Sequence, residues 1–372
     1  MKKIGIIAEY NPLHNGHIYH IKKIKEKYKD SLIILVMSGN FTQRGDISII
    51  NKWDKTKIAL NYVNLVIELP FVFATQGADI FAKGAIEILK ELKVDNIIFG
   101  SESNNIELIK KLAQTQLTKE YEELVKKYTK EKINYPTAMS NALKEICKET
   151  ITEPNDILGV CYTKEIIKQK AQIEPETIQR TNNYNDTKIT SNIISATAIR
   201  EQIKQNKNIE NYVPKETLKY INQTTIENFY PLLKYKIITE KNLNKYETVD
   251  EGISYRIKKY INQSNTLEEL INNIKTKYYT HNRLKRMFLH IICNFTKEEN
   301  KQCKHIHYIR ILGFNEKGKK YIKEIKSKTN VPLISNYTNK KDIMLEIENR
   351  TTEIYSLIQE KTSELEKPII RQ

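Results

Sequence analysis

The sequence predicts an α/β protein in which a doubly wound parallel sheet is followed by a mostly helical C-terminal domain. Over the first 100 residues, short continuous apolar runs alternate with amphipathic ones, which is typical of parallel strands covered by helices on both faces. This alternation stops near residue 205. The chain has 372 residues, enough for two domains, and we expect them at 1–205 and 206–372.

Four apolar runs within the first 101 residues are predicted to be buried strands, and a later segment, 171–180, is expected to form a short final strand. A polar or glycine-bearing segment comes after each of them, as expected where the chain turns. Right-handed crossovers between such strands produce a doubly wound sheet. The runs are KIGIIAEY (3–10), SLIILVMSG (31–39), VNLVIELP (63–70), VDNIIFGS (94–101) and AQIEPETIQR (171–180).

The segments between these strands carry apolar residues at helical spacing. Residues 105–150 also read as helices, and Ser195 is a plausible N-cap for a helix over 195–207. Long patterns at 318–326 and 341–361 favour helices in the second domain. The helices that connect the strands are expected at 16–28, 52–62, 79–92 and 151–170.

The loops that follow the first four strands point to one site. They read NPLHNGH, SGNFTQRGD, PFVFATQGAD and GSES, so all four are polar or contain glycine. In doubly wound sheets the ligand lies at the carboxyl ends of the strands, and these loops share that edge.

The first of these loops contains an HxGH motif formed by His14, Gly16 and His17. It lies between the first strand and the next helix, whose N-terminus offers free N–H groups and a positive dipole end to an anion. Gly16 would let the backbone approach a ligand closely. The two imidazoles could donate hydrogen bonds to phosphate oxygens, above all if charge grows there during a reaction.

Two other interpretations of the histidines stay open, a metal site and a structural role. His14, His17 and His20 recur every three residues, a spacing that drifts around a helix, and no cysteine lies nearby to supplement them. We therefore favour phosphate binding by His14 and His17 and predict no metal site. His20 is expected to be a packing or surface residue.

A second motif, ISATAIR at 194–200, places Ser195, Thr197 and Arg200 at another loop-to-helix junction. Hydroxyl groups, helix N–H groups and an arginine form a second possible phosphate site. Alone, this pattern usually marks only a helix cap. Together with HxGH it is more specific for nucleotide binding.

These motifs resemble those of the HIGH-type nucleotidyltransferases, with their Rossmann-like domain. The segments GIIAEYNPLHNGH, VMSGNFTQRGD, KW, LVIELP, FGSES, PNDILGVCY, SATAIR and LGFNEKG narrow the resemblance to the tRNA(Met) cytidine acetate ligase family. The matches are dense over the first 200 residues and continue to about residue 320.

The resemblance implies an ATP-dependent ligase. Such an enzyme activates acetate as acetyladenylate, releases pyrophosphate, and acetylates N4 of the wobble cytidine (C34) of elongator tRNA(Met). ATP would be the co-substrate, together with Mg²⁺, for which we name no protein ligand.

The resemblance also implies the site residues. His14 and His17 would be catalytic, and the nucleotide would be held by the first loop, by single residues after later strands and by the second motif. The implied ATP-binding residues are Ile7, Ala8, Glu9, Tyr10, Asn11, Pro12, Leu13, His14, Asn15, Gly16, His17, Ile18, Tyr19, His20, Gly100, Asn155, Arg180, Ser195, Thr197 and Arg200.

Three charged residues near the expected pocket are further candidates. Arg44 and Lys52 follow the second strand and are expected to face the pocket, where they would meet phosphate or a substrate carboxylate; we count Lys52 as catalytic. Their alternative is a solvated loop charge. Asp79 could orient a substrate or cap its helix, and we favour capping.

The net charge of +16 is concentrated in the second half, because residues 271–330 contain 15 Lys and Arg but only 4 Asp and Glu. A local basic excess favours polyanion binding, although a solvated helical domain would look similar. We predict tRNA contacts from Arg283, Arg286, Arg310, Lys317, Lys319 and Lys320.

Two other functions remain possible from the sequence. One is a small-molecule adenylyltransferase of the nicotinamide-mononucleotide or phosphopantetheine type, which would not need a basic helical domain. The other is an RNA-binding protein with a disabled nucleotide site, against which the intact motifs argue. The composition favours a cytoplasmic protein with reduced thiols and no membrane segment, and no protein partner can be inferred.

Overall fold

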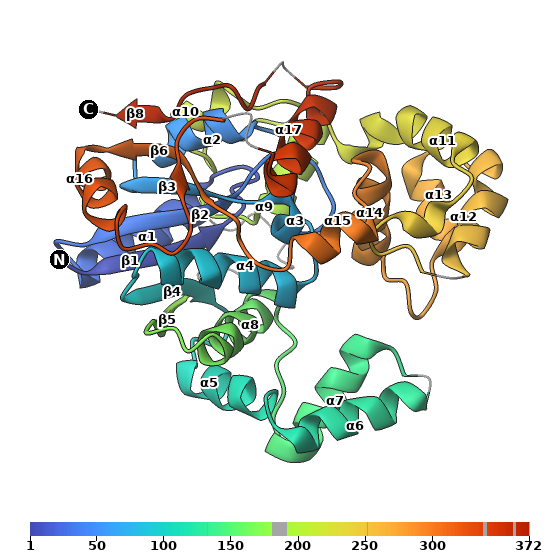
Figure 1. Cartoon of the computed structure of the whole chain (residues 1–372), viewed down its shortest axis with the longest axis horizontal. Helices are drawn as coiled ribbons and strands as arrows, with labels where there is room; N and C mark the ends of the chain where they lie inside the picture. The colour runs from blue at the N-terminus through green and yellow to red at the C-terminus, as the bar shows by residue number, and fades with distance from the viewer. Residues whose placement is uncertain (132, 181–191, 251, 338–340, 360–361, 372) are drawn as a thin grey trace.

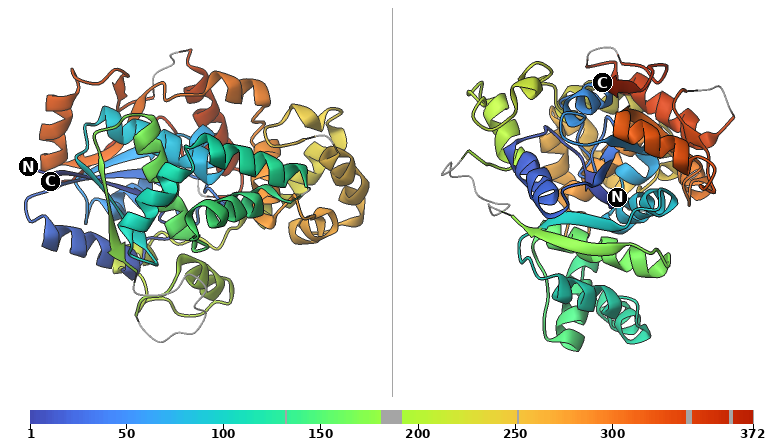
Figure 2. Two further views of the ribbon diagram at one scale, coloured as in Figure 1. Left: turned by 90° about the horizontal axis from the view of Figure 1, so that it is seen from below. Right: turned by 90° about the vertical axis from the view of Figure 1, so that its left-hand side faces the viewer.

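The structure, a computed structural model, describes residues 1–131, 133–180, 192–250, 252–337, 341–359 and 362–371. Its centre is an eight-stranded sheet with helices on both sides (Figures 1 and 2). The first five strands lie where the sequence predicts them. They are β1 (Lys3–Ala8), β2 (Leu32–Ser38), β3 (Leu65–Leu69), β4 (Asn96–Ser101) and β5 (Glu174–Gln179).

These five strands are parallel and have the order β5-β4-β1-β2-β3. The chain moves outward from β1 to β3, then returns to the other side of β1 to form β4. The carboxyl ends of β1 and β4 are therefore the point where the winding reverses, and ligands bind at such points in open α/β sheets. The predicted doubly wound α/β class is confirmed.

Two groups of helices cover the faces of the sheet. Ile21, Ile24 and Ile199 belong to the apolar cluster on one face, whereas Ile86 and Leu89 belong to the cluster on the other. The helices of the first face are α1 (Asn15–Lys27), α2 (Lys52–Ala59), α9 (Ala196–Lys204) and α10 (Lys215–Leu218). Those of the second are α3 (Phe71–Ala74), α4 (Ala78–Glu91), α5 (Ile106–Thr115), α8 (Pro154–Lys168) and α17 (Ile343–Tyr355).

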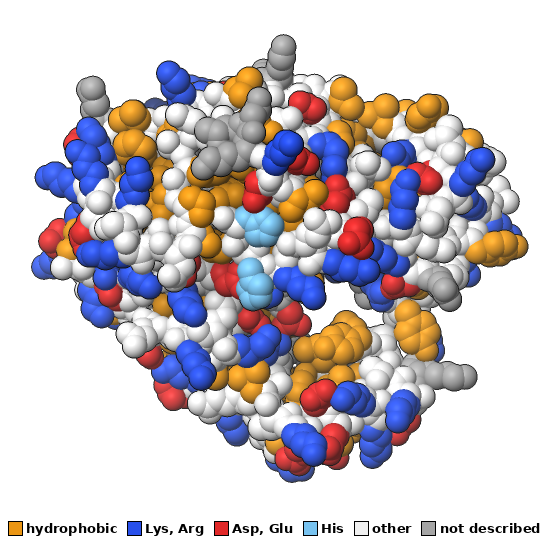
Figure 3. Space-filling model, viewed as in Figure 1, with side chains coloured by type: hydrophobic (Ala, Val, Ile, Leu, Met, Phe, Trp, Pro, Cys, Tyr) orange, Lys and Arg blue, Asp and Glu red, His pale blue; other side chains and the backbone are white. Residues whose placement is uncertain are grey.

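Two helical units extend beyond the sheet. One is a hairpin that projects away from it, formed by α6 (Lys119–Lys130) and α7 (Tyr135–Cys147) (Figure 1). Between this hairpin and the second unit, Figure 3 shows a hollow in the surface. The second unit comprises η1 (Ile226–Phe229), α11 (Tyr230–Thr239), η2 (Leu243–Lys245), α12 (Ile253–Tyr260), η3 (Ile261–Gln263), α13 (Leu267–Ile274), α14 (His281–Ile292) and α15 (Lys297–Gln302).

The sheet does not stop at residue 205, where we expected the first domain to end. After the helical unit the chain returns and β6 (Ile309–Asn315) pairs antiparallel with β3. The short strands β7 (Leu333–Ile334) and β8 (Ile369–Arg371) both pair with β6. The second half is thus helical only up to about residue 302, and its remainder, including α16 (Glu316–Ile325), completes the sheet domain.

Strand β6 was not predicted from the sequence, although RILGFN is a short apolar run like those of the first strands, because its partner β3 lies about 250 residues earlier in the chain. All four cysteines are buried and unpaired. In the part of the chain that the structure describes, no helix is both long and apolar enough to span a membrane.

Candidate active site

A cavity of about 260 Å³ lies at the carboxyl ends of β1 and β4. Segments that follow four parallel strands contribute to its wall, including Glu9, Arg44, Gly100 and Arg180. The loop after β3 is different, because its Thr75 bonds to His290 of α14 instead of facing the cavity. Of the four loops that the sequence placed at one site, those after β1 and β2 line the cavity, the GSES segment contributes only Gly100 at the end of β4, and the loop after β3 does not line it.

His14 is the N-cap of α1, and its side chain also lines the cavity. Its ring Nδ1 accepts a hydrogen bond from the backbone N–H of Gly16 at 3.0 Å. Burial, together with the positive charges of Arg180 and Arg200, lowers the pKa of His14 to about 3. A neutral ring whose Nδ1 is an acceptor carries its proton on Nε2, so His14 can donate a hydrogen bond from Nε2.

His17 has the same arrangement one turn later. Its Nδ1 accepts a hydrogen bond from the backbone N–H of His14 at 3.2 Å, which completes a capping box. Burial lowers the pKa of His17 well below its usual value, with His14 and Arg180 adding to the effect. The two ring centroids are 3.8 Å apart, so two Nε2–H donors stand side by side at the N-terminus of a helix.

Position 16 has no room for a side chain. A Cβ atom built on Gly16 would lie 2.8 Å from Cε1 of His14, closer than side-chain carbons approach one another. Any other residue would therefore push the His14 ring away from its capping position. The glycine of HxGH keeps the first imidazole in place.

The two sequence motifs meet in this cavity. The Arg200 guanidinium donates to the backbone oxygen of Asn11 at 2.7 Å and to Thr197 at 3.3 Å. Ser195 caps α9 by accepting from the N–H of Ala198. Two helix N-termini and one arginine thus converge on the same space, as expected for a site that holds a polyphosphate.

Asn15 fixes the entrance of α1 from the opposite side. Its side-chain amide donates to the backbone oxygens of Asn192 and Asn211, each at 2.9 Å. Asn15 does not line the cavity, and neither do Pro12, Leu13 and Ile18, although the resemblance includes all four in the ATP loop. They hold the loop, while the remaining residues of 7–20 face the cavity.

Gly100, Asn155 and Arg180 lie together on the wall formed by β4, the start of α8 and the end of β5. Both polar side chains interact with Glu102: the Asn155 amide donates a hydrogen bond to it, and Arg180 forms an ion pair, with Nε 3.6 Å from Oε1. Glu102, in the GSES loop, was not singled out from the sequence. The same holds for Phe99 and Tyr162, whose rings stand edge to face at 5.7 Å and form an apolar part of the wall.

Comparison with known proteins identifies the chain. The family model described as HIGH Nucleotidyl Transferase matches residues 1–368. Two relatives named tRNA(Met) cytidine acetate ligase, from Anoxybacillus flavithermus and Clostridium novyi, are both 39% identical. The first alignment covers 95% of this chain and 94% of the relative, the second 98% and 97%. The chain belongs to the tRNA(Met) cytidine acetate ligase family of HIGH nucleotidyl transferases.

The fold agrees with this family. The crystal structure of apo Thermotoga maritima TmcAL has a TM-score of 0.91 and is 29% identical, with 100% of this chain and 99% of that chain covered. A second structure of that protein, bound with alpha-thio ATP, has a TM-score of 0.88 at the same identity and coverage. The protein is therefore an enzyme of the ligase class with a nucleotidyltransferase fold, as the sequence predicted.

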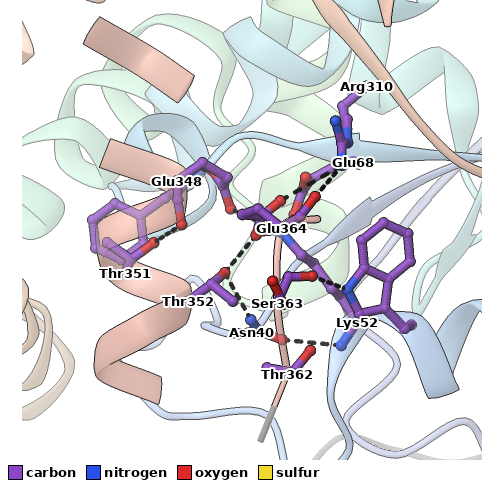
Figure 4. A network of polar contacts seen from close by, with 12 residues as sticks. Asn40, Lys52, Glu68, Arg310, Glu348, Thr351, Thr352, Thr362, Ser363 and Glu364 are labelled. Carbon is purple, nitrogen blue, oxygen red and sulfur yellow. Dashed lines mark hydrogen bonds and ion pairs between the residues drawn. The ribbon is translucent and has the colours of Figure 1, made fainter. Parts of the chain in front are cut away.

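Lys52 does not face the cavity, and this expectation was wrong. Its side chain is fully buried, and its Nζ lies 2.7 Å from Glu68, 3.7 Å from Glu348 and within bonding distance of Glu364 (Figure 4). Burial alone would lower the pKa of Lys52, but the three carboxylates together raise it above its usual value. The lysine neutralises buried acids rather than contacting a substrate.

Arg310 cannot contact tRNA as predicted, because it is only 1% exposed. It donates to the backbone oxygen of Glu364 at 2.9 Å within the same network (Figure 4).

Asp79 does not cap α4, contrary to our expectation. The N-cap is Gly77, and the Asp79 carboxylate accepts a hydrogen bond from Lys164 at 2.5 Å.

The other predicted tRNA contacts lie at opposite ends of the sheet. Arg283 and Arg286 are on α14, beside the carboxyl ends of the strands, where Arg286 donates to the backbone oxygen of Gln43. Lys317, Lys319 and Lys320 are on α16, which follows β6 at the amino end of β3. On the face in Figure 3, basic side chains are spread among acidic ones.

Proposed function

We propose that this protein activates acetate with ATP as acetyladenylate, releases pyrophosphate, and transfers the acetyl group to N4 of the wobble cytidine of elongator tRNA(Met). The observation that carries the proposal is the pair of Nε2–H donors of His14 and His17 beside Arg200 in one cavity. The names of the relatives and the nucleotide analogue bound by the Thermotoga protein support it.

The chemistry explains why two steps are needed. Free acetate is a poor acyl donor, and the exocyclic amine of cytosine is a poor nucleophile because its lone pair is delocalised into the ring. When acetate attacks the α-phosphorus, negative charge grows on the phosphate oxygens and on the departing pyrophosphate. Fixed donors at these positions stabilise that charge without having to reorganise, and no acyl-enzyme is required.

The lowered pKa values of the two histidines fit this role. Both rings stay neutral near pH 7. They can therefore donate hydrogen bonds from Nε2 to the phosphates without binding them as full positive charges, which would hold the product pyrophosphate too tightly. Mg²⁺ would enter as part of the ATP complex. Among the described residues no group of three or more His, Cys, Asp and Glu could hold a metal, and we assign no step to a protein-bound ion.

The test uses purified protein with ATP, labelled acetate and unmodified tRNA(Met). The expected result is acetate-dependent pyrophosphate release, followed by labelled N4-acetylcytidine in nuclease digests of the tRNA. Label in an AMP ester but never in tRNA would show that the acceptor is wrong. No pyrophosphate with acetate, but pyrophosphate with a phosphorylated small molecule, would favour the adenylyltransferase alternative. Because tRNA is located in the cytoplasm, a tRNA acceptor would also place the enzyme there.

A further inference from the structure

A cleft of about 720 Å³ lies directly beside the nucleotide cavity. The two spaces share four wall residues, Arg44, Asp46, Thr197 and Arg200. A group bound in the cleft would therefore reach the nucleotide across a single layer of side chains. No step of adenylation itself requires this second space.

The cleft is formed where the helical unit meets the sheet domain. One wall is α9 with the segment around η1, and the other is the start of α14, including Lys285. The loop after β2 closes it, because Lys285 Nζ lies 2.9 Å from Asp46 and the backbone of α14 leaves no room for a Cβ at Gly45, which has φ +79°. The helical unit is thus held against the nucleotide site at a fixed distance.

The chemistry of the cleft suits a nucleic acid strand. The segment 222–228 lines it with amide and hydroxyl side chains, among them Asn222, Thr225 and Asn228. Amide groups of this kind hydrogen-bond the edges of unpaired bases. Lys204 is exposed at the end of α9 and, with Arg44 and Arg200, supplies positive charge for the backbone phosphates. The lining also holds four acidic residues, of which Asp46 is paired with Lys285 and Glu268 with His281, while Glu201 and Glu227 lie on the walls formed by α9 and η1.

Two carboxylates lie near the junction of the two spaces: Asp46, which lines both and is paired with Lys285, and Glu9. Glu9 lines the nucleotide cavity, and its Oε1 accepts a hydrogen bond from the backbone N–H of Gln43 at 2.6 Å. The next residue, Arg44, lines both spaces. A carboxylate would repel the phosphates of ATP, but it is complementary to the exocyclic amine of cytosine, which presents N–H donors.

We propose that this cleft is the acceptor site, in which the RNA strand lies with its cytidine turned toward the nucleotide cavity, and that Glu9 accepts the proton of the attacking amine. The inference rests on the proposed function. N4 forms a bond to the acetyl carbonyl carbon, the bond from that carbon to the phosphate oxygen of AMP breaks, AMP leaves, and the amine proton passes to the Glu9 carboxylate.

The test separates the two half-reactions. Acetate-dependent exchange of pyrophosphate into ATP measures adenylation without tRNA, and single-turnover transfer of labelled acetyl measures the second step. Glu9→Gln keeps an oxygen for the Gln43 N–H but cannot take the proton, so transfer should fall at least tenfold more than exchange. Lys204→Glu should raise the KM for tRNA at least tenfold, whereas the rate of pyrophosphate exchange should stay close to that of the unchanged protein.

Matched controls are Glu26→Gln on α1 and Lys207→Glu just after α9, both exposed and outside the cleft; these should change neither half-reaction. The inference is overturned if Glu9→Gln and Lys204→Glu lose exchange and transfer in equal proportion, or if they transfer acetyl like the unchanged protein. Absence of exchange in the unchanged protein would instead contradict the proposed function itself.

Discussion

At the residue scale, His14 has two roles that can be separated. Its Nδ1 caps α1, while its Nε2 faces the cavity. An asparagine can replace the first role, because its side-chain oxygen lies close to the position of Nδ1 and asparagine is a good N-cap. It has no atom at the position of Nε2.

We therefore expect His14→Asn to fold normally but to lose adenylation. The free energy of unfolding should stay within about 1 kcal/mol of the unchanged protein, since a helix cap of similar strength remains. Acetate-dependent pyrophosphate exchange should fall about 10²- to 10³-fold, the usual cost of removing one donor to a developing negative charge. Exchange within threefold of the unchanged protein would contradict the assignment.

Gly16 gives a second prediction, with Gly77 as its control. Gly16→Ala displaces the His14 ring, and exchange should fall by up to about 10²-fold, as expected for a catalytic group moved by about 1 Å. Gly77 caps α4 with φ −62°, and a Cβ built there meets nothing within 4 Å. Gly77→Ala should leave exchange unchanged. Equal loss in both variants would mean that the steric argument is wrong.

The histidines could be predicted from sequence because their geometry is local. His14, Gly16 and His17 lie within four residues, and a helix start fixes their relative positions. Lys52 could not be predicted in this way. Its partner Glu364 lies 312 residues later, and nothing in the motif around Lys52 indicates whether its neighbours are phosphates or carboxylates.

At the element scale, the Lys52 network joins α2, β3, β6 and α17 with the segment near 364. Thr352 on α17 donates to Glu364, and Trp53 Nε1 donates to the backbone oxygen of Ser363 at 2.9 Å (Figure 4). Since Glu68, Glu348 and Glu364 are all buried, Lys52, which lies within 4 Å of all three, is their main compensating charge, and Arg310 adds an ion pair with Glu364 at 3.9 Å.

Lys52→Met should therefore destabilise the protein by about 3–5 kcal/mol, the range for removing one partner from a buried charge pair. The matched control is Lys57→Met on the same helix, which removes the solvent-exposed partner of an ion pair with Asp54 and should cost at most about 1 kcal/mol. Urea denaturation measures both. Any activity lost in Lys52→Met should follow the loss of folded protein. Loss of exchange in a variant of full stability would restore the catalytic interpretation.

The network also makes stability depend on pH. Burial, reinforced by Glu68, raises the pKa of Glu348 well above its usual value. The folded protein then holds this proton at pH values where the unfolded chain releases it. The free energy of unfolding therefore decreases as pH rises from about 4.5 through the raised pKa.

Glu348→Gln should flatten this decrease. The amide has nearly the same shape as the protonated acid and does not titrate. Urea denaturation between pH 4.5 and 8 should give a shallower curve for the variant than for the unchanged protein. Glu353→Gln, an exposed change on the same helix, should give a curve parallel to that of the unchanged protein. Parallel curves for Glu348→Gln would show that Glu348 is ionised across this range.

At the scale of the whole molecule, the strand–helix alternation predicted the sheet well, because β2 and β3 are continuous apolar runs that are buried throughout and β1 and β4 are largely buried; β5 (EPETIQ) is more polar and lies at the edge. Five strands and the helices between them follow from it. The return of β6 to the edge of β3 did not, since pairing across about 250 residues leaves no local pattern. The basic excess over 271–330 is likewise spread over several elements, among them α14, α15, the buried Arg310 and α16, which composition alone cannot show.

The position of α16 leads to a prediction about tRNA binding. Lys319 and Lys320 lie at the amino end of the sheet, away from the nucleotide cavity. Changing both to glutamate should raise the KM for tRNA less than threefold, whereas Lys204→Glu beside the cavity should have a much larger effect. A large effect of the Lys319 and Lys320 changes would mean that the tRNA also reaches the far end of the sheet.

The pairing of β3 with β6 also sets an order of events during synthesis. The edge strand β3 is covered only when β6 has been synthesised, because Leu65 of β3 pairs with Phe314 of β6. At about 5–20 residues per second, the ribosome needs on the order of 12–50 s to make the intervening chain. For that time the nascent sheet domain exposes an open, apolar strand edge, which is prone to pairing with other chains. The catalytic loops are thus made first, but the sheet beneath them is finished only after the helical unit has been synthesised.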